Sequence, residues 1–322
     1  MLRSPRALII GINGQDGIFL SQVLRNSGYT VFGVGNSPSV NENVSEGVLY
    51  NQCDIRDTSK LLDLIIENEI YEIYNLAAVS SVNQSFLNPS LTFEVNYYAV
   101  KRLLGGVFSS SFKDHFLIRF FQASSSEMFG ITLVEPQNEN LGFNPVSPYG
   151  TSKVMALESC RQYRENGFYV SSAIMYNHES IHRPTQYVTR KISRTVAAIA
   201  NGQADKLSIG NLQVQRDWGY ASDYMQAAFL MLQQKVPNDY IIATGIVHSV
   251  QDLISMAFAE VGLGGRESEF LLIDEGLMRP REISRLIGDS SKARIDLGWE
   301  PTKPFAEVFR HMVLHDLSLL GN

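Results

Sequence analysis

The chain has 322 residues, of which 44% are hydrophobic and 19% charged, a composition typical of folded globular proteins and not of disordered ones. Its formal net charge of −6 disfavours binding along a nucleic-acid backbone, which needs clustered positive charge to displace counterions. No apolar run approaches the ~20 residues that span a bilayer, no signal peptide is evident, and Cys53 and Cys160 are the only cysteines. We therefore expect a cytoplasmic protein that binds neither membranes nor nucleic acids.

The first half of the chain alternates short apolar runs with segments of helical periodicity. The run Ala7–Ile10 ends in glycines, and apolar residues then recur at helical spacing from Phe19 to Leu24. Further strands are expected at 29–34, 72–77, 117–123 and 170–175, with helices at 59–67 and 97–109. Strands separated by such helices imply right-handed crossovers and a parallel sheet that is covered on both faces. The sequence thus predicts a doubly wound α/β fold.

The second half is less regular. Helices are expected at 188–200, 223–234, 253–261 and 305–319, and strands at 207–210 and 240–244. Because helix 223–234 and strand 240–244 are expected to return to the first sheet, we predict two discontinuous domains. Residues 1–176 plus 212–244 would form a dinucleotide-binding domain, and residues 177–211 plus 245–322 a smaller α/β substrate-binding lobe.

A glycine-rich turn follows the first strand and opens the first helix. In this context, glycines at positions 11, 14 and 17 permit a tight turn, a close approach of backbone N–H groups to a pyrophosphate, and close helix–sheet packing. The alternative is a glycine-rich turn without a ligand. Side chains at the ends of the neighbouring strands fall where a bound dinucleotide would lie. The candidate cofactor residues are Gly11, Asn13, Gly14, Gln15, Asp16, Gly17, Asn36, Ser37, Asp54, Ile55, Leu76, Ala77 and Ala78.

The end of the second strand bears on the choice of cofactor. An acidic residue there would bond the ribose of NAD, and an arginine would favour NADP. The sequence has Gly35-Asn36-Ser37 instead, which repels neither cofactor and supplies no cation. The residues themselves leave NAD and NADP both open.

A tyrosine and a lysine stand four residues apart in Ser147-Pro148-Tyr149-Gly150-Thr151-Ser152-Lys153, so that they share one face of a helix. A lysine ammonium near a phenol lowers its pKa, which enables Tyr149 to act as a base toward an alcohol. The segment Gln122 to Glu127 follows a predicted parallel strand at the edge where ligands bind. It adds the hydroxyl of Ser125 and the carboxylate of Glu127 to the same crevice.

Taken in order, these segments resemble the extended short-chain dehydrogenase/reductase superfamily with its Rossmann sheet, and within it the GDP-mannose 4,6-dehydratase family. The resemblance spans almost the whole chain. Besides the motifs above, it rests on Asn75-Leu76-Ala77-Ala78, Asn177-His178-Glu179-Ser180, Val188 to Ile192, Gly210-Asn211-Leu212, Arg216-Asp217-Trp218-Gly219, Ala243-Thr244-Gly245, His248-Ser249-Val250 and Arg279-Pro280-Arg281-Glu282.

The resemblance implies an internal redox dehydration of a GDP-sugar with NADP, or with NAD, as cofactor. Tyr149 would be the base at the 4-hydroxyl, Lys153 its electrostatic partner and a ribose contact, and Ser125 a hydrogen-bond partner of O4. Glu127 would take the C5 proton and protonate the leaving 6-hydroxyl. His178 and Arg183 would also contact the cofactor. The substrate would contact Ser80, Ser126, Asn177, Val188, Lys191, Gly210, Asn211, Arg216, Arg279 and Glu282.

The chain also departs from the family pattern. The family's arginines and longer loop after the second strand are replaced by Gly35 to Glu46, and its Pro-Arg-Arg-Gly by Ile181-His182-Arg183-Pro184. A related substrate such as GDP-manno-heptose therefore stays open, as does the choice between a homodimer and a homotetramer. His178 and Glu179 lack a third metal ligand, so no metal is expected.

Two other functions compete with the dehydratase. A GDP-4-keto-6-deoxy-sugar reductase or epimerase would share the Tyr149/Lys153 pair, but Glu127 and the Asn177 to Ser180 segment favour dehydration. A catalytically silent dinucleotide-binding protein would not need Tyr149, Lys153 and Glu127 together.

Overall fold

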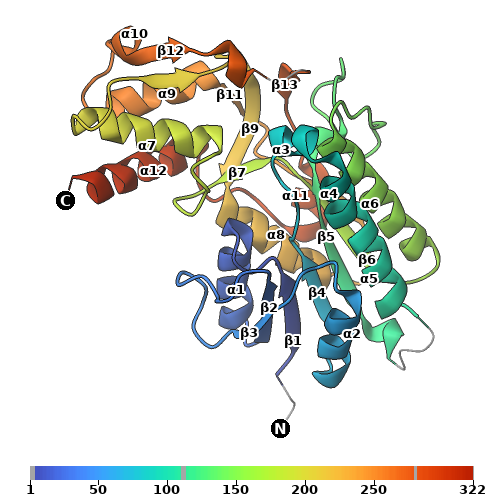
Figure 1. The fold of residues 1–322 in the computed structure, drawn as a ribbon. Coiled ribbons are helices and arrows are strands. Elements are labelled where there is room, and N and C mark those ends of the chain that lie inside the picture. The colour runs from blue at the N-terminus through green and yellow to red at the C-terminus, as the bar shows by residue number, and fades with distance from the viewer. Residues whose placement is uncertain (1–3, 110–113, 279–280, 322) are drawn as a thin grey trace.

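The computed structural model describes residues 4–109, 114–278 and 281–321. Within these residues, a parallel seven-stranded sheet in the order β10-β6-β5-β4-β1-β2-β3 forms the centre of the larger part of the molecule (Figure 1). Its strands are β1 (Arg6–Ile10), β2 (Thr30–Gly35), β3 (Leu49–Gln52), β4 (Glu72–Asn75), β5 (Arg119–Ser125), β6 (Tyr169–Met175) and β10 (Asp239–Ile242). The strand order reverses between β1 and β4, which is where open α/β sheets bind their ligands.

Helices cover both faces of this sheet because its strands are apolar on both sides. Ala7 and Ile9 of β1 pack into one core cluster and Leu8 and Ile10 into another, and all four are at most 1% exposed. The first cluster includes residues of α1 (Gln15–Asn26), α8 (Ala221–Gln233) and α11 (Ser291–Leu297). The second includes residues of α2 (Thr58–Glu67), α5 (Ala99–Val107) and α6 (Pro148–Glu165).

A smaller lobe lies beside the carboxyl edge of the large sheet (Figure 1). Its core contains residues of α7 (Val188–Ala200), α9 (Val250–Glu260) and α12 (Phe305–Leu320). One of its sheets pairs β9 (Gln215–Tyr220) with β7 (Asn177–Glu179), β11 (Val247–Ser249) and β13 (Arg285–Leu286), and another pairs β8 (Leu207–Ile209) with β12 (Leu271–Ile273). The remaining elements are α3 (Val82–Leu87), α4 (Pro89–Phe93), α10 (Glu267–Phe270), a π-helical turn at Glu94–Tyr98, and 3-10 turns at His115–Leu117, Ser126–Met128 and Glu275–Leu277.

The side chain of Asp217 joins the two parts of the molecule. It is fully buried on β9 and accepts hydrogen bonds from Thr244 N (2.9 Å), Thr244 Oγ1 (2.6 Å), Gly245 N (2.8 Å) and Gly288 N (3.3 Å). Thr244 and Gly245 follow β10 of the large sheet after one residue, Ala243. A buried carboxylate is stable only when such donors satisfy it, so Asp217 fixes the points where the chain passes between the two sheets.

The structure confirms the doubly wound parallel sheet with a second, smaller lobe. In the segment 212–244, which we assigned to the first domain, β10 joins the large sheet and α8 packs on it, whereas β9 lies in the smaller lobe. The division into two domains otherwise stays a prediction. Across the described residues, no helix has the length and apolarity that crossing a membrane requires.

Substitution of Gly17 by alanine is expected to destabilise the fold. A Cβ atom at this position of α1 would lie 2.3 Å from the backbone oxygen of Ile12, so the helix would have to move away from the turn. Overpacking of this kind costs about 1–3 kcal/mol of unfolding free energy, to be measured by urea denaturation. Gly142→Ala is the control, because a Cβ atom at Gly142 meets no atom within 4 Å. Equal stability of the two variants would contradict the expectation.

Candidate active site

A cavity of about 710 Å³ lies where the carboxyl ends of β1, β4 and β5 face β7 and α7 of the smaller lobe. Of the predicted site residues, Gly17 and Ser37 do not line it, and Arg279 lies outside the described residues. Those that line it are Gly11, Asn13, Gly14, Gln15, Asp16, Asn36, Asp54, Ile55, Leu76, Ala77, Ala78, Ser80, Ser125, Ser126, Glu127, Tyr149, Lys153, Asn177, His178, Arg183, Val188, Lys191, Gly210, Asn211, Arg216 and Glu282.

The glycine-rich turn is shaped to receive a pyrophosphate. Gly11 has φ of 94°, and a Cβ atom there would lie 2.9 Å from the backbone nitrogen of Ala77, so only glycine fits between the two strand ends. Gly14 is the N-cap of α1 and supplies no capping side chain, which leaves the first N–H groups of the helix available to an anion. The residues at this turn therefore fit a dinucleotide cofactor.

Hydrogen bonds tie this turn to the smaller lobe. Gln15 Nε2 donates to the backbone oxygen of His178 (3.0 Å), and Ser180 Oγ donates to Gln15 Oε1 (2.8 Å). The ring of His178 lies 3.0 Å from the carboxylate of Asp16. Burial alone would raise the pKa of Asp16, but the charge and hydrogen bond of His178 outweigh burial and lower it. The cofactor turn and β7 are thus held as one unit.

Two of the predicted cofactor residues, Asn13 and Asp54, form hydrogen bonds with neighbours that were not predicted. Asn13 holds the loop after β2, because its Nδ2 donates to Ser39 O (3.1 Å) and its Oδ1 accepts from Asn41 N (2.9 Å). Asp54 accepts two hydrogen bonds from the guanidinium of Arg56, at 2.9 and 2.7 Å. Arg56 lines the cavity and was not among the predicted residues, since no motif marks it.

Tyr149 and Lys153 lie on the first turns of α6, where Ser147 caps the helix by accepting from Gly150 N (3.0 Å). Both are buried, with 9% and 3% exposure, and Lys153 Nζ lies 5.8 Å from the centre of the Tyr149 ring. Lys153 Nζ donates to the backbone oxygen of Ala123 at 2.7 Å. Burial lowers the pKa of Lys153 to about 8.

The sequence predicted that Lys153 lowers the pKa of Tyr149, whereas the structure shows a raised pKa for this phenol. The cause is burial, which disfavours phenolate, and a hydrogen bond with Ser125 opposes it only in part. The ammonium of Lys153 donates its hydrogen bond to the backbone oxygen of Ala123 and not to the phenol. In the ligand-free chain the phenol is therefore protonated at neutral pH, and it must lose this proton before it can act as a base toward a bound alcohol.

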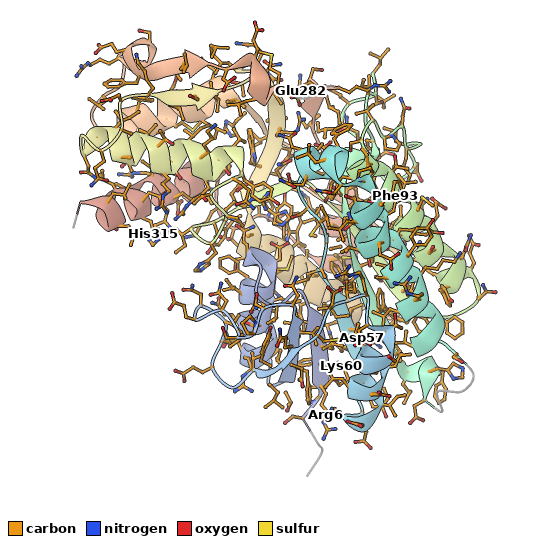
Figure 2. All side chains as sticks on the ribbon, in the orientation of Figure 1. Arg6, Asp57, Lys60, Phe93, Glu282 and His315 are labelled. Carbon is orange, nitrogen blue, oxygen red and sulfur yellow. The ribbon has the colours of Figure 1, made fainter. Side chains whose placement is uncertain are left out.

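Glu127 follows β5 in a 3-10 turn, and its backbone nitrogen donates to Ser125 Oγ (3.3 Å). Its carboxylate lies 3.8 Å from Arg216 Nη2, and the same guanidinium nitrogen lies 3.4 Å from Glu282 Oε1. Arg216 is 4% exposed. Glu282 lies at the end of the molecule opposite Arg6 and Lys60 (Figure 2). Two carboxylates from different lobes thus share one buried cation.

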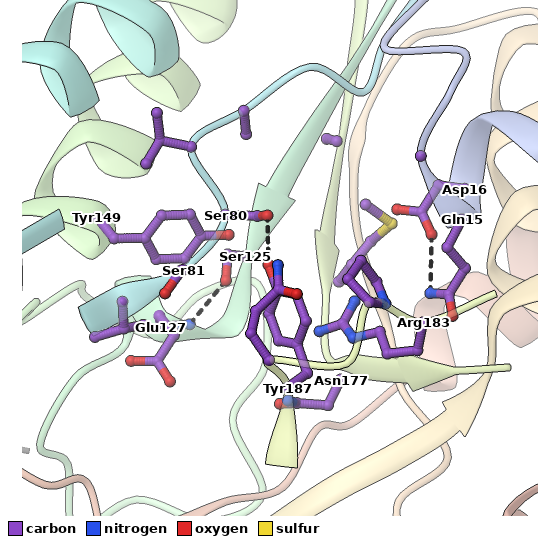
Figure 3. Close-up of a pocket in the computed structure, with 18 of the residues that line it drawn as sticks. Gln15, Asp16, Ser80, Ser81, Ser125, Glu127, Tyr149, Asn177, Arg183 and Tyr187 are labelled. Atoms are coloured by element: carbon purple, nitrogen blue, oxygen red, sulfur yellow. Dashed lines mark hydrogen bonds between the residues drawn. The ribbon is translucent and has the colours of Figure 1, made fainter. Parts of the chain in front are cut away.

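A close-up of the cavity shows further polar side chains, among them Ser80, Asn177 and Tyr187, near Tyr149 and Glu127 (Figure 3). The hydroxyl of Ser80 is bonded to that of Tyr187 (2.6 Å), which sequence reasoning missed because the two residues are distant in the chain. Ser126 is 2% exposed and Asn177 is half-buried. Among the described residues, no group of three or more His, Cys, Asp or Glu side chains is arranged to hold a metal ion.

Comparison with known proteins identifies the family. Residues 8–312 match the family model described as GDP-mannose 4,6 dehydratase. GDP-mannose 4,6 dehydratase 2 of Arabidopsis thaliana is 40% identical, over 97% of this chain and 87% of its own length, and GDP-mannose 4,6 dehydratase of Homo sapiens is 38% identical, over 98% and 92%.

Solved structures support the fold alone. A UDP-glucose 4-epimerase of Thermotoga maritima superposes with a TM-score of 0.86 at 22% identity, over 98% of this chain and 99% of its own. The protein RMD of Pseudomonas aeruginosa, solved with NADPH, gives 0.80 at 21% identity, over 98% and 100%.

Fold and site together define a nucleotide-sugar enzyme of the Rossmann type, with a Tyr149/Lys153 pair beside a dinucleotide turn. Within that class, the chain belongs to the GDP-mannose 4,6-dehydratase family. It is therefore an NAD(P)-dependent lyase that removes water from a sugar nucleotide.

Proposed function

We propose that the chain converts GDP-mannose to the GDP-4-keto-6-deoxy sugar. The observation that carries this is the placement of Tyr149, Lys153 and Glu127 in one cavity with the buried cation Arg216. Such a cavity combines a proton acceptor for an alcohol, a carboxylate for elimination, and a cation for a diphosphate. Curated relatives at 36–40% identity bear the corresponding name.

The proposal assigns the steps of the reaction to individual residues. Nicotinamide, when bound, supplies the hydride acceptor at C4 and the hydride donor at C6. Tyr149 takes the proton of the 4-hydroxyl, while Ser125 bonds O4 and Lys153 stabilises the phenolate. The 4-ketone acidifies the C5 proton, which Glu127 accepts and then gives to the departing 6-hydroxyl. The hydride then adds to C6 and C5 takes up a proton, which balances the proton that Tyr149 took from the 4-hydroxyl and now gives up. The products are water and the keto sugar, and both the cofactor and the enzyme return to their starting states.

The part of the cavity that adjoins Glu127 through Arg216 suits the nucleotide. Lys191 and Arg216 supply positive charge for the diphosphate, and Arg216 is pre-positioned because its Nη1 donates to the backbone oxygen of Ile283 at 2.8 Å. Asn177, Asn211 and Glu282 supply the polar groups for ribose and guanine. These assignments extend the family pattern to residues that line the cavity in the structure.

We further propose NADP as the preferred cofactor, with NAD as the alternative. No carboxylate stands at Gly35, Asn36 or Ser37 to repel a 2′-phosphate, and Arg56, which is paired with Asp54, is a cation that lines the same cavity. Titration of the purified protein with each cofactor measures the preference. An Arg56→Ala variant that loses affinity for NADP alone would place the 2′-phosphate beside this residue.

We also propose a homodimer formed through α3 to α5, with a homotetramer as the alternative. Leu87, Leu91 and Tyr98 are 71%, 43% and 46% exposed on this helical segment, and they offer apolar surface that a second copy of the chain would cover. Light scattering of the purified protein measures its mass. A Leu87→Glu variant that stays dimeric would contradict an interface at this segment.

The reaction is tested by incubating the protein with GDP-mannose and, separately, GDP-manno-heptose, in the presence of NADP or NAD. Mass spectrometry should show a product lighter by one water, without net formation of reduced cofactor. Turnover only of a 4-keto sugar, with stoichiometric oxidation of reduced cofactor, would instead identify a reductase. Binding of the cofactor without any turnover would identify a silent dinucleotide-binding protein.

A further inference from the structure

The hydrogen bond between Ser80 and Tyr187 connects the two parts of the molecule across the cavity. Ser80 follows β4 of the large sheet, and Tyr187 is the N-cap of α7 in the smaller lobe. Their hydroxyl oxygens are 2.6 Å apart, although 107 residues separate them in the chain. Both residues line the cavity, and Ser80 is exposed. The pair thus lies in open space that a ligand can reach, and not in a packed interface.

The ring of Tyr187 is held in place by its contact with Arg183. The guanidinium of Arg183 lies over its ring at 3.7 Å from the centroid, and Arg183 Nε lies 3.2 Å from Glu179 Oε2. Glu179 is 1% exposed and accepts a hydrogen bond from Thr189 Oγ1 at 2.7 Å. A ring stacked on a guanidinium that is itself anchored to a buried carboxylate loses little conformational entropy when its hydroxyl binds a ligand.

The Tyr187 hydroxyl points toward the reacting end of the cavity. Figure 3 shows Tyr187 between the group formed by Ser125 and Tyr149 on one side and Arg183 with Asp16 on the other. The residue after it, Val188, begins α7, which carries the diphosphate candidate Lys191. Tyr187 therefore lies beside the catalytic pair at the start of α7, the helix that carries Lys191, so a hexose between the catalytic pair and a diphosphate at Lys191 would lie close to it.

We propose that Tyr187, together with Ser80, positions the hexose of the substrate and helps to determine which sugars are accepted. The proposal rests on the proposed function, since it assumes a GDP-sugar in the cavity. A pair of exchangeable hydroxyls suits a polyol ligand, because each can both donate and accept a hydrogen bond. In the ligand-free chain the two satisfy one another, and a sugar hydroxyl can replace either partner without leaving a polar group unpaired.

The alternative is that the pair only fastens the lobes together. A fastening contact would affect every ligand of the cavity and the stability of the fold alike. A sugar-positioning contact affects only ligands that carry a sugar beyond the diphosphate. Comparison of GDP with GDP-mannose separates the two, because both share the nucleotide and only one reaches Tyr187.

The test is the Tyr187→Phe variant, which keeps the ring on Arg183 and removes one oxygen. We expect kcat/KM for GDP-mannose to fall about ten- to hundredfold, as for a lost hydrogen bond worth 1.4–2.7 kcal/mol, while the inhibition constant of GDP changes less than about twofold. Ser80→Ala should give the same pattern, and the double variant should lose little more than either single one. Tyr169→Phe is the matched control, because that hydroxyl bonds to Met231 O and Gln234 O away from the cavity.

Two outcomes overturn the proposal: equal losses for GDP and GDP-mannose, which indicate a fastening contact, or no loss for either. Absence of turnover by the unaltered enzyme would be a failure of the proposed function instead. In that case calorimetric titration with GDP and GDP-mannose makes the same comparison without catalysis, and unequal losses in Tyr187→Phe still support a sugar-facing hydroxyl.

Discussion

Replacement of Tyr149 by phenylalanine is expected to lower kcat about 10²- to 10⁴-fold, the range for loss of a positioned proton acceptor. The phenol is the hydroxyl in the cavity that is bonded to Ser125 and has Lys153 on the same helical face. Without it, the 4-hydroxyl keeps its proton and oxidation at C4 does not begin. Rapid mixing of the variant with GDP-mannose should therefore show no rise in the absorbance of reduced nicotinamide.

The Tyr149→Phe variant must still be folded and able to bind its ligands for this result to be informative. Cofactor titration and thermal unfolding should match those of the parent, since the ring that packs in the cavity is retained. A variant with more than about a tenth of the parental kcat would contradict the role of Tyr149, because general bases contribute at least ~10²-fold.

Replacement of Glu127 by glutamine is expected to lower kcat by a similar factor, but at a later step. The amide cannot accept the C5 proton, whereas Tyr149 and Lys153 remain in place to oxidise C4. One equivalent of reduced nicotinamide should then accumulate on the enzyme, and exchange of the C5 hydrogen with solvent deuterium should be lost. The two variants thus separate the oxidation from the elimination.

Glu282→Gln is the matched control for Glu127→Gln, because both carboxylates lie beside the same nitrogen of Arg216. If Glu282 serves the nucleotide, its replacement should raise KM and leave kcat nearly unchanged. Normal loss of water by Glu127→Gln, or an equal fall in kcat for both variants, would contradict the assignment of the elimination to Glu127.

The elements that the sequence predicted well are those whose periodicity is local. Strand 170–175 and helix 188–200 correspond closely to β6 and α7, because their apolar residues repeat at the period of the element. The short strands β7, β9, β11 and β13 were not predicted as strands. Asn177–Glu179 and Gln215–Tyr220 carry polar and charged residues, and their extended conformation depends on pairing with one another across the lobe.

In the candidate site, too, residues in local sequence motifs were predicted and some residues outside them were not. Residues in motifs, such as Gly14 and Tyr149, were predicted and line one cavity in the structure. Arg56 was missed because no motif marks it, and Tyr187 was missed because its partner Ser80 is distant in the chain. Gly17 belongs to the glycine motif yet lies behind the turn, where its missing Cβ lets α1 approach Ile12. Whether each lining residue binds the assigned ligand stays a prediction that the variants above test.

The hydrogen bonds of Asp217 bear on how ligands enter and leave. This buried carboxylate binds β9 to Thr244, Gly245 and Gly288, so separating the sheets there would expose four broken hydrogen bonds. The contact between Ser80 and Tyr187 is single and accessible to solvent. We therefore expect any separation of the two parts to widen the cavity at Tyr187 before it reaches Asp217, because one accessible hydrogen bond is broken there and four buried ones would be broken at Asp217.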